Sequence, residues 1–362
     1  MDRRIGSVLF VLLVGCSGAT STTGATAANT TSPAGGASAM LKAPEAVAMG
    51  PDGMIYLSDC AAQRIFRLGT DGQPTVVAGS GPEGFEAGGL AGDGGLATEA
   101  RLNCPAGLAF DPKGNLFVGD TVNNRVRMID PSGVITTAVG SGPVGLDAGA
   151  FAGDGGPASE AGLNFPNGIA FDESGNLYIA DHGNDAIRKV DKRGVITTVA
   201  GTGVGGYSGD GGAATHAMLH GPWCIVIDAR GSLYFTEKEN DLVRKVDRKG
   251  IITTVAGTAG AVFKETYGLA RDAAGNLYVS DDIANVILKI GTGGGITTFA
   301  GTGKKGHSGD GGPAIAARLT TPFELFLDPA SNLYVADGGN GCVRMIDLAG
   351  TITSLVCGGS GA

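Results

Sequence analysis

Acidic residues recur along this chain in two patterns whose spacing suits binding chemistry. One acid closes a short β-prone run in each of six similar segments, and these acids are Asp59, Asp120, Asp181, Glu237, Asp281 and Asp337. A second pattern, "GDGG", places an acid between glycines at Asp93, Asp154, Asp210 and Asp310. A ring of carboxylates can hold a cation, and a glycine-rich loop with an acid can cradle a phosphate or an ion.

The repetition of both patterns favours structural roles over binding. A ligand site needs one or two copies of a repeated motif, whereas the capping of a turn applies to every copy. The glycines of "GDGG" permit backbone angles closed to other residues, and its acid can accept backbone N–H groups where a short helical turn begins. No "GK[ST]" follows any copy, which disfavours a phosphate loop. Cation binding by one or more copies is the alternative.

The elements that position these acids repeat six times, aligned on the segment 166–203. The six closing acids are spaced by 61, 61, 56, 44 and 56 residues. Each unit holds four short β-branched and aromatic runs, such as "GIAF", "NLYIA", "AIRKV" and "VITTVA", separated by Asp/Gly/Asn turns. This pattern predicts an antiparallel four-stranded sheet per unit, covered on both faces by its neighbours, and no helical solenoid.

The consensus "P-x-G-I-A-x-D…G-N-L-Y-x-A-D…N-x-x-I-R-K-V-D…G-x-I-T-T-V-A-G-T-G" resembles the NHL repeat. The resemblance covers about residues 41–360 and implies an all-β, six-bladed β-propeller of four-stranded antiparallel blades. We therefore expect the propeller over 41–362. Its blades are expected at about 41–103, 104–164, 165–220, 221–265, 266–320 and 321–362.

The N-terminus predicts export and a lipid anchor. Two arginines precede an apolar run over 5–14, which fits a secretory signal within residues 1–16. "LVGC" (13–16) resembles the bacterial lipobox, which implies lipidation of Cys16 and, with Ser17 behind it, the outer membrane. The alternative is an ordinary signal peptide with a chance cysteine. Residues 17–40 are Ser/Thr/Ala/Gly without charge, so we expect a flexible tether, and whether it adds a strand is left open.

Blades differ most at the position that opens each inner strand, near the axis. These positions are Glu45, Ala106, Asn167, Trp223, Tyr267 and Phe323. Three consecutive aromatics facing Glu45 and Asn167 suit a ligand with an apolar or sugar face and a polar edge, unless the rings simply plug the axial channel. On the same rim, the candidate binding set is completed by Glu324, Asp181, His182 and Glu237.

Glu45 and Asn167 also raise a metal hypothesis. "PEAV" and "PNGI" resemble two of the ligand segments of the regucalcin/gluconolactonase family, also six-bladed, which implies a divalent ion such as Ca²⁺ at the axis. Glu, Asn and Asp oxygens are what such a cation takes. The third ligand is the difficulty, because the remaining equivalent positions offer no Asp and Glu324 is one residue out of register.

Zinc-dependent and serine-dependent chemistry find less support. The peptidylamidoglycolate lyases are NHL propellers with a His-ligated zinc, and four histidines fall on the candidate rim: His182, His216, His220 and His307. Zinc requires its ligands to converge within about 2.1 Å of one ion, and nothing in the spacing shows this. No G-x-S-x-G nucleophile elbow stands out.

Five cysteines remain once Cys16 is set aside. A two-residue turn at 349–350 places Cys342 and Cys357 opposite each other in the last hairpin, so we expect a disulfide there. Cys60 and Cys104 fall on the same rim between blades 1 and 2 and form a second candidate pair. Cys224 is then a buried thiol beside Trp223. The alternative is that all five are small core residues.

Charge and the lack of a complete catalytic constellation narrow the range of functions. A net charge of −9 and a pI near 4.9 argue against nucleic acid as a partner. No catalytic constellation is complete, so the sequence favours a monomeric, envelope-anchored binding module for a protein, peptide or glycan at the axial rim, without a cofactor. The alternative is a lactonase-like, metal-dependent hydrolase or lyase with its ion at the axial mouth. A purely structural scaffold is the third hypothesis.

Overall fold

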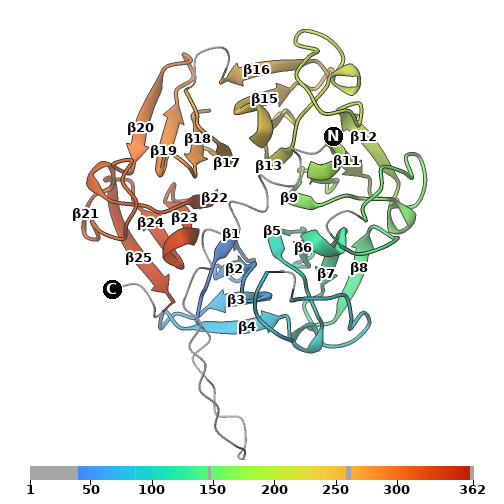
Figure 1. The fold of residues 1–362 in the computed structure, drawn as a ribbon, viewed down its shortest axis with the longest axis horizontal. Helices are drawn as coiled ribbons and strands as arrows, with labels where there is room; N and C mark the ends of the chain where they lie inside the picture. Colours follow the sequence, from blue (N-terminus) through green and yellow to red (C-terminus); the bar gives the residue numbers. More distant parts are fainter. Residues whose placement is uncertain (1–39, 86, 146–147, 258–261, 359–362) are drawn as a thin grey trace, which may run out of the picture.

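The structure, a computed structural model, describes residues 40–85, 87–145, 148–257 and 262–358. Over these ranges the chain forms six antiparallel sheets arranged in a circle (Figure 1). The predicted all-β six-bladed propeller is therefore confirmed. The predicted signal segment, Cys16 and the tether up to residue 39 lie outside the described residues. Within the described ranges, no helix has the length and apolar composition needed to cross a membrane.

The first three blades each contain four strands, which run from the axis outward in chain order. Blade 1 contains β1 (Pro44–Met49), β2 (Ile55–Asp59), β3 (Arg64–Leu68) and β4 (Pro74–Ala78). Blade 2 contains β5 (Pro105–Phe110), β6 (Leu116–Asp120), β7 (Arg125–Ile129) and β8 (Ile135–Val139). Blade 3 contains β9 (Pro166–Phe171), β10 (Leu177–Asp181), β11 (Ala186–Val190) and β12 (Ile196–Ala200).

The last three blades repeat this order, and blade 6 gains a short fifth strand. Blade 4 contains β13 (Pro222–Ile227), β14 (Leu233–Glu237), β15 (Leu242–Val246) and β16 (Ile252–Ala256). Blade 5 contains β17 (Thr266–Arg271), β18 (Leu277–Asp281), β19 (Val286–Ile290) and β20 (Ile296–Ala300). Blade 6 contains β21 (Gly312–Pro313), β22 (Pro322–Leu327), β23 (Leu333–Asp337), β24 (Cys342–Ile346) and β25 (Thr351–Cys357).

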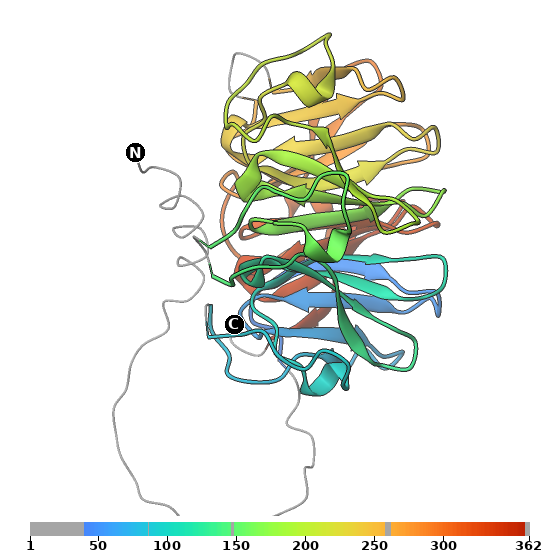
Figure 2. The ribbon, with the colours of Figure 1, turned by 90° about the vertical axis from the view of Figure 1, so that its right-hand side faces the viewer.

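Short 3₁₀ turns are the helical elements of the described chain. Four follow second strands: η2 (Thr121–Asn123), η4 (His182–Asn184), η6 (Lys238–Asn240) and η8 (Gly338–Asn340). Four lie in crossovers between blades: η1 (Ala97–Glu99), η3 (Ala158–Glu160), η5 (Ala214–His216) and η7 (Ala314–Ala316). Seen from the side, the strands run across the thickness of the disc, so turns gather at its two faces (Figure 2).

Aspartate and glycine close the hairpins as the sequence predicts. In the turn between β9 and β10, Asp172 Oδ1 accepts the Asn176 backbone N–H at 2.9 Å. Gly175 has a φ of +77°, a left-handed conformation that glycine adopts without strain, and its N–H bonds to the Asp172 carbonyl at 2.8 Å. The turn chemistry therefore fixes where each strand begins.

The inner strands of neighbouring blades lie very close together at the axis. A Cβ at Gly168 would lie 2.5 Å from the Trp223 carbonyl oxygen, and one at Gly268 would lie 2.4 Å from that of Phe323. In all six blades the pairing of the inner strand with the second strand shifts register over the first residues of the inner strand. Such bulges change the direction of side chains, and here they set the residues around the axis.

The acid of "GDGG" does not have the predicted capping role. The turn η3 begins after Pro157 without a side-chain cap. Asp154 instead pairs with Arg188 of the next blade, with an Oδ1 to Nη2 distance of 2.7 Å, and its Oδ2 accepts the Thr198 backbone N–H at 3.0 Å. The backbone of this crossover also bonds to the outer strand of blade 3. We call each "GDGG" crossover a clasp, because it joins its acid and backbone to the following blade.

Each clasp aspartate pairs with a buried arginine of the following blade. The third residue of the third strand is a fully buried arginine in blades 2, 3, 4 and 6: Arg127, Arg188, Arg244 and Arg344. Each pairs with a clasp aspartate and also with the acid that closes the second strand of its own blade. Blades 1 and 5 follow no "GDGG" and carry Phe66 and Leu288 at this position. The arginine thus accompanies the clasp.

Closure and the disulfides follow the sequence predictions. Blades 1 and 6 are each complete without exchanging a strand, and β1 lies against β22. Cys342 and Cys357 are directly paired in the β24–β25 hairpin and form a disulfide. Cys60 and Cys104 form the second disulfide, between blades 1 and 2. Cys224 is a buried free thiol, as predicted.

Candidate functional site

Three aromatic residues that open inner strands form a stack near the axis. The ring centroids of Trp223 and Tyr267 lie 4.6 Å apart, as do those of Tyr267 and Phe323. His182 places the edge of its ring on Trp223 at 4.8 Å, with an interplanar angle of 84°. The predicted convergence of these residues from blades 3 to 6 is therefore observed. We call His182, Trp223, Tyr267 and Phe323 the axial stack.

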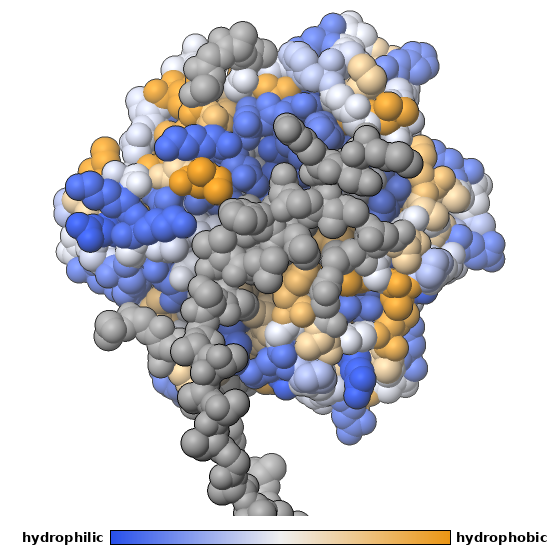
Figure 3. Space-filling view, viewed as in Figure 1, coloured by the Kyte–Doolittle hydropathy of each residue, from blue (hydrophilic) through white to orange (hydrophobic). Residues whose placement is uncertain are grey.

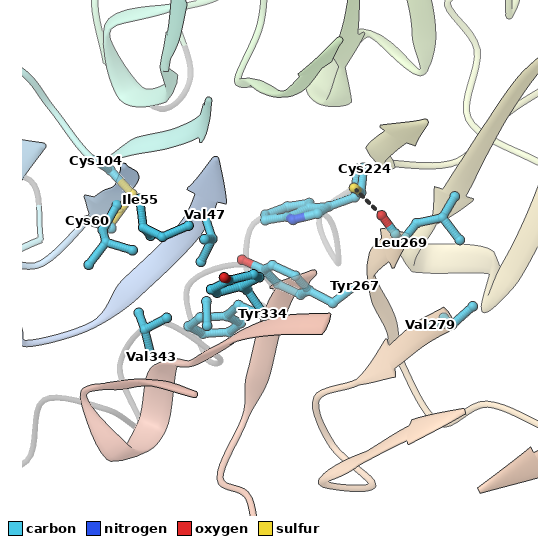
Figure 4. Close-up of a cluster of buried hydrophobic side chains, with 14 of the residues drawn as sticks. Val47, Ile55, Cys60, Cys104, Cys224, Tyr267, Leu269, Val279, Tyr334 and Val343 are labelled. Carbon is cyan, nitrogen blue, oxygen red and sulfur yellow. Dashed lines mark hydrogen bonds between the residues drawn. A yellow bond between two sulfur atoms is a disulfide. The ribbon is translucent and has the colours of Figure 1, made fainter. Parts of the chain in front are cut away.

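The axial stack is buried. The exposed fractions of Trp223, Tyr267 and Phe323 are 3%, 2% and 4%. In Figure 4 the Tyr267 ring lies in the central core, with Val47 of blade 1 and Tyr334 of blade 6 close by. Edge-on and tilted ring contacts at these distances add to the stabilisation that burial provides.

Lys238 covers the stack. Its ammonium lies 4.5 Å from the centre of the Trp223 ring and 4.7 Å from that of Tyr267. It also pairs with Glu265 Oε1 at 3.0 Å, although the lysine side chain is only 4% exposed. A buried ammonium needs such partners, because removal from water is costly and the negative ring faces attract it.

Lys238 is a site residue that was not predicted from the sequence, although a signal for it exists there. The residue directly after each strand-closing acid differs in every blade, and these residues are Cys60, Thr121, His182, Lys238, Asp282 and Gly338. The turns that carry them lie beside the starts of the inner strands, as the bond from the Lys238 N–H to the Gly221 carbonyl shows. This second ring of variable positions contributes as much to the site as the first ring.

Glu45 is held by the stack. It is 3% exposed, and the Tyr267 hydroxyl donates a hydrogen bond to its Oε1. Its Oε2 has no hydrogen-bond partner among the described residues. Burial raises the pKa of Glu45 to about 7, against the lowering effects of the Tyr267 hydrogen bond and the Lys238 charge. Glu45 therefore titrates near neutral pH, where a carboxyl group can act as an acid or a base.

Glu324 has a different partner. It stands one residue after Phe323, and Cys224 donates its thiol to Oε1 at a distance of 3.5 Å. Figure 4 shows the second contact of this thiol, with the Leu269 carbonyl at 3.6 Å. Burial, followed by the charge of Glu45, raises the pKa of Glu324 to about 8 despite the thiol hydrogen bond. The group is therefore mostly neutral at pH 7.

The predicted calcium set stays a prediction. Glu45 and Asn167 are both buried and belong to blades 1 and 3, while Glu324 belongs to blade 6. A hard cation takes ionised carboxylates, so both glutamates would have to lose a proton and change partners to bind it.

Asp181 and Glu237 have structural partners on both oxygens. Asp181 accepts the Asn164 backbone N–H at 2.7 Å on one oxygen, and Asn184 and Arg188 on the other. Glu237 is engaged in the same way, and both side chains are fully buried. The predicted structural role of the strand-closing acids is confirmed.

The four rim histidines do not gather in one group. His216 lies in η5 and His307 beside the disulfide of blade 6. His182 lies in the axial stack, where burial, together with the His220 charge, lowers its pKa to about 4. In the described part of the chain, one group of three His, Cys, Asp or Glu residues has ligand atoms within 4.8 Å of one another: His307, Cys342 and Cys357. Its two sulfurs are joined in the disulfide, so they are not thiolate ligands.

Comparison with known proteins gives a sequence relationship to one family. The family model described as the teneurin NHL domain matches residues 70–148, 145–207 and 203–265. Human teneurin-1 is 29% identical over 315 residues, and human teneurin-4 is 27% identical over 320 residues; each match covers 81% of this chain and 10% of the relative. The chain thus spans about one tenth of the length of these relatives.

Solved structures resemble the propeller at low sequence identity. A streptogramin B lyase superposes with a TM-score of 0.55 at 17% identity, covering 90% of this chain and 86% of the lyase. An auxiliary nutrient binding protein from Bacteroides thetaiotaomicron gives 0.57 at 13% identity, covering 87% of this chain and 70% of that protein. A gluconolactonase from Xanthomonas campestris gives 0.52 at 16%, covering 91% and 90%. These likenesses show the fold.

Proposed function

Because this chain belongs to the family of teneurin NHL domains, we propose that it acts through its propeller as a non-catalytic binding module. Its ligand is a protein, a peptide or a glycan, held at the rim where inner strands start. The axial stack and its cover of polar groups form the binding site. The propeller works as a monomer and needs no cofactor.

The observation that carries this proposal is the buried Lys238 ammonium, which lies over the rings of the axial stack. Burial of an ammonium among rings and carboxyl groups stabilises a fold less than an apolar side chain of similar size would. Local departures of this kind from the best core packing concentrate at functional sites. The stack also occupies positions at which the blades differ, so its residues are not set by the repeated pattern of strands, turns and clasps.

The proposal includes the place where the module works. Cys16 is lipidated and becomes the new N-terminus, and the tether holds the propeller at the outer membrane of a bacterial cell envelope. The support is the "LVGC" segment at 13–16 with its preceding apolar run. Incorporation of a labelled fatty acid into the wild type and its loss in Cys16→Ala would support this location. Equal labelling of both proteins would contradict it.

The binding role is tested by removing the cover charge. The full chain and its variant Lys238→Met are probed against arrays of peptides and oligosaccharides. The control Lys245→Met loses a similar lysine contact, 5.3 Å above the Tyr234 ring and away from the axial stack. We expect the wild type and Lys245→Met to bind the same probes, and Lys238→Met to change affinity by about tenfold. Identical binding by all three proteins would contradict the proposal.

A second candidate function is supported by one specific observation. Glu45 has a pKa of about 7 beside the Tyr267 hydroxyl, which suits general acid or base catalysis in a lactonase-like hydrolase or lyase. Two of the structural neighbours are named as a lyase and a gluconolactonase. Turnover of a lactone that requires Ca²⁺ and is lost in Glu45→Gln would favour this function. No turnover with or without Ca²⁺ would favour the binding module.

A further inference from the structure

The seam between blades 4 and 5 differs from the clasped seams. The crossover from blade 4 to blade 5 carries no "GDGG", and Leu288 replaces the buried arginine in blade 5. The end of this crossover lies beside the turn after β18, because Lys264 and Ala284 both donate their backbone N–H to Asp281, at 2.7 Å each. Across this seam, the Thr236 and Thr266 hydroxyls also donate to the carbonyls of Tyr267 and Glu237, at 2.7 and 3.1 Å.

Carboxyl groups without hydrogen-bond partners gather at this seam. Asp282 is only 1% exposed, yet neither of its oxygens has a hydrogen-bond partner among the described residues. The same is true of Oδ1 of Asp241, in the turn after η6. Buried polar atoms are bonded in the great majority of cases, so these acceptors indicate a missing donor.

The positive charges at the seam are fewer than the negative ones. Lys238 is the buried ammonium, and it already pairs with Glu265 at 3.0 Å. The Lys238 charge also lowers the pKa of Asp282, but burial dominates and raises it to about 7. Exposed Lys264 acts on the neighbouring acid Asp281. Glu239 faces the seam of blades 3 and 4 instead, where His182 Nε2 lies 3.6 Å from its Oε1. Figure 3 shows hydrophilic surface gathered over blades 4 and 5.

The spacing of the acids favours an organic cation over a metal ion. Within the described residues, these carboxyl groups do not provide three ligand atoms within 4.8 Å of one another. An ammonium or a guanidinium carries several N–H donors and can reach acceptors that are farther apart. Two exposed apolar residues, Val262 and Ile283, flank the acids on the crossover and on the turn. They provide apolar contact for the chain that carries the cation.

We propose that the seam of blades 4 and 5 recognises a lysine or arginine side chain of a partner polypeptide, through Asp282, Asp241 and Glu265. The proposal rests on the proposed binding function and names the chemistry of its ligand. The basic side chain donates to the free carboxylate oxygens, and its polypeptide lies over Val262 and Ile283. Lys238 of the chain itself shows that a cation is held beside these acids, because its ammonium lies over the rings of the axial stack.

The test is fluorescence anisotropy at pH 8 with a short lysine-rich peptide carrying a dye. Wild-type full chain is compared with the double variant Asp282→Asn, Glu265→Gln. The matched control is Glu99→Gln, Glu160→Gln, which removes two exposed carboxylates from η1 and η3. We expect the double variant to bind at least about tenfold more weakly and the control to match the wild type. Added salt and acetylation of the peptide lysines should both weaken wild-type binding.

Stability separates a binding role from a structural one. Asp282→Asn removes a buried carboxyl group that has no hydrogen-bond partner, so this variant should have a higher Tm than the wild type at pH 8 while binding the peptide more weakly. A lower Tm together with unchanged peptide affinity would overturn the inference. If the acid variants match the wild type in peptide binding while Lys238→Met still alters capture on the arrays, the seam proposal fails and the proposed function stands.

Discussion

Substitution of Arg188 by leucine tests how the clasps hold the blades in place. Arg188 is fully buried, and its guanidinium joins Asp181 at 3.0 Å to Asp154 at 2.7 Å. It also donates to the carbonyls of Gly162 and Ala152, at 3.2 and 3.1 Å. The change to leucine follows the chain itself, which carries an aliphatic side chain at this position in blade 5.

The expected loss of unfolding free energy depends on which contacts each substitution removes. Asp181 is fully buried and would keep only neutral donors, so Arg188→Leu should lower the free energy of unfolding by about 3–5 kcal/mol. The Asp154 side chain is 48% exposed, so water can replace part of its contact, and Asp154→Ala should cost about 1–2 kcal/mol. The total stability of a domain is about 5–15 kcal/mol, so the first loss is large.

The assay is urea unfolding followed by far-ultraviolet circular dichroism. Arg193→Leu serves as the control, because Arg193 is 81% exposed and pairs with Asp191 at 2.8 Å on the surface. This pair should contribute at most about 1 kcal/mol. A double-mutant cycle between Asp154 and Arg188 should give a coupling of about 1–3 kcal/mol. If Arg188→Leu is no more destabilising than Arg193→Leu, the clasp does not stabilise the blade seams as argued.

Three further predictions concern the axial core and the last hairpin. The neutral Glu324 carboxyl contributes stability that is fully present below about pH 4.5 and is lost as pH rises through its folded pKa of about 8. The free energy of unfolding measured in urea should therefore fall with pH over this range in the wild type, and this fall should be smaller in Glu324→Gln. Tyr267→Phe removes the hydrogen bond to Glu45; it should lower unfolding free energy by about 1–2 kcal/mol and raise the Glu45 pKa in a carboxyl NMR titration. Replacement of both Cys342 and Cys357 by serine opens a cross-link over a separation of 15 residues and should cost about 3 kcal/mol in thermal unfolding. An unchanged pH profile, an unchanged Glu45 pKa or an unchanged Tm would count against the respective argument.

The repeat pattern made the fold predictable, because each unit has the same sequence pattern of strands and turns. Six copies fixed the number of blades, and the two-residue turn before Thr351 fixed the register that pairs Cys342 with Cys357. The convergence of Trp223 and Tyr267 also followed, because equivalent positions of different blades meet at the axis. These predictions needed backbone geometry alone.

Side-chain partners between blades were harder to predict. The acid of "GDGG" looked like a local cap, but its partner lies 34 residues further along, as in the pair of Asp154 and Arg188. The signal was the joint occurrence of the clasp and the arginine. Lys238 and Asp282 were missed because they belong to no consensus, and their roles depend on which side chains fill the axis. The repeat consensus does not predict which side chains are buried at one seam or how their charges balance.

The emission of Trp223, the single tryptophan of the chain, tests the binding site most directly. In the free protein we expect blue-shifted emission and weak quenching by iodide, because the indole is 3% exposed. A titration with peptides and oligosaccharides should give a saturable change for one class of ligand, since displacement of Lys238 alters the charge 4.5 Å from the ring. Emission that no ligand changes would mean that the axial stack is a core plug, and the proposed site would be wrong.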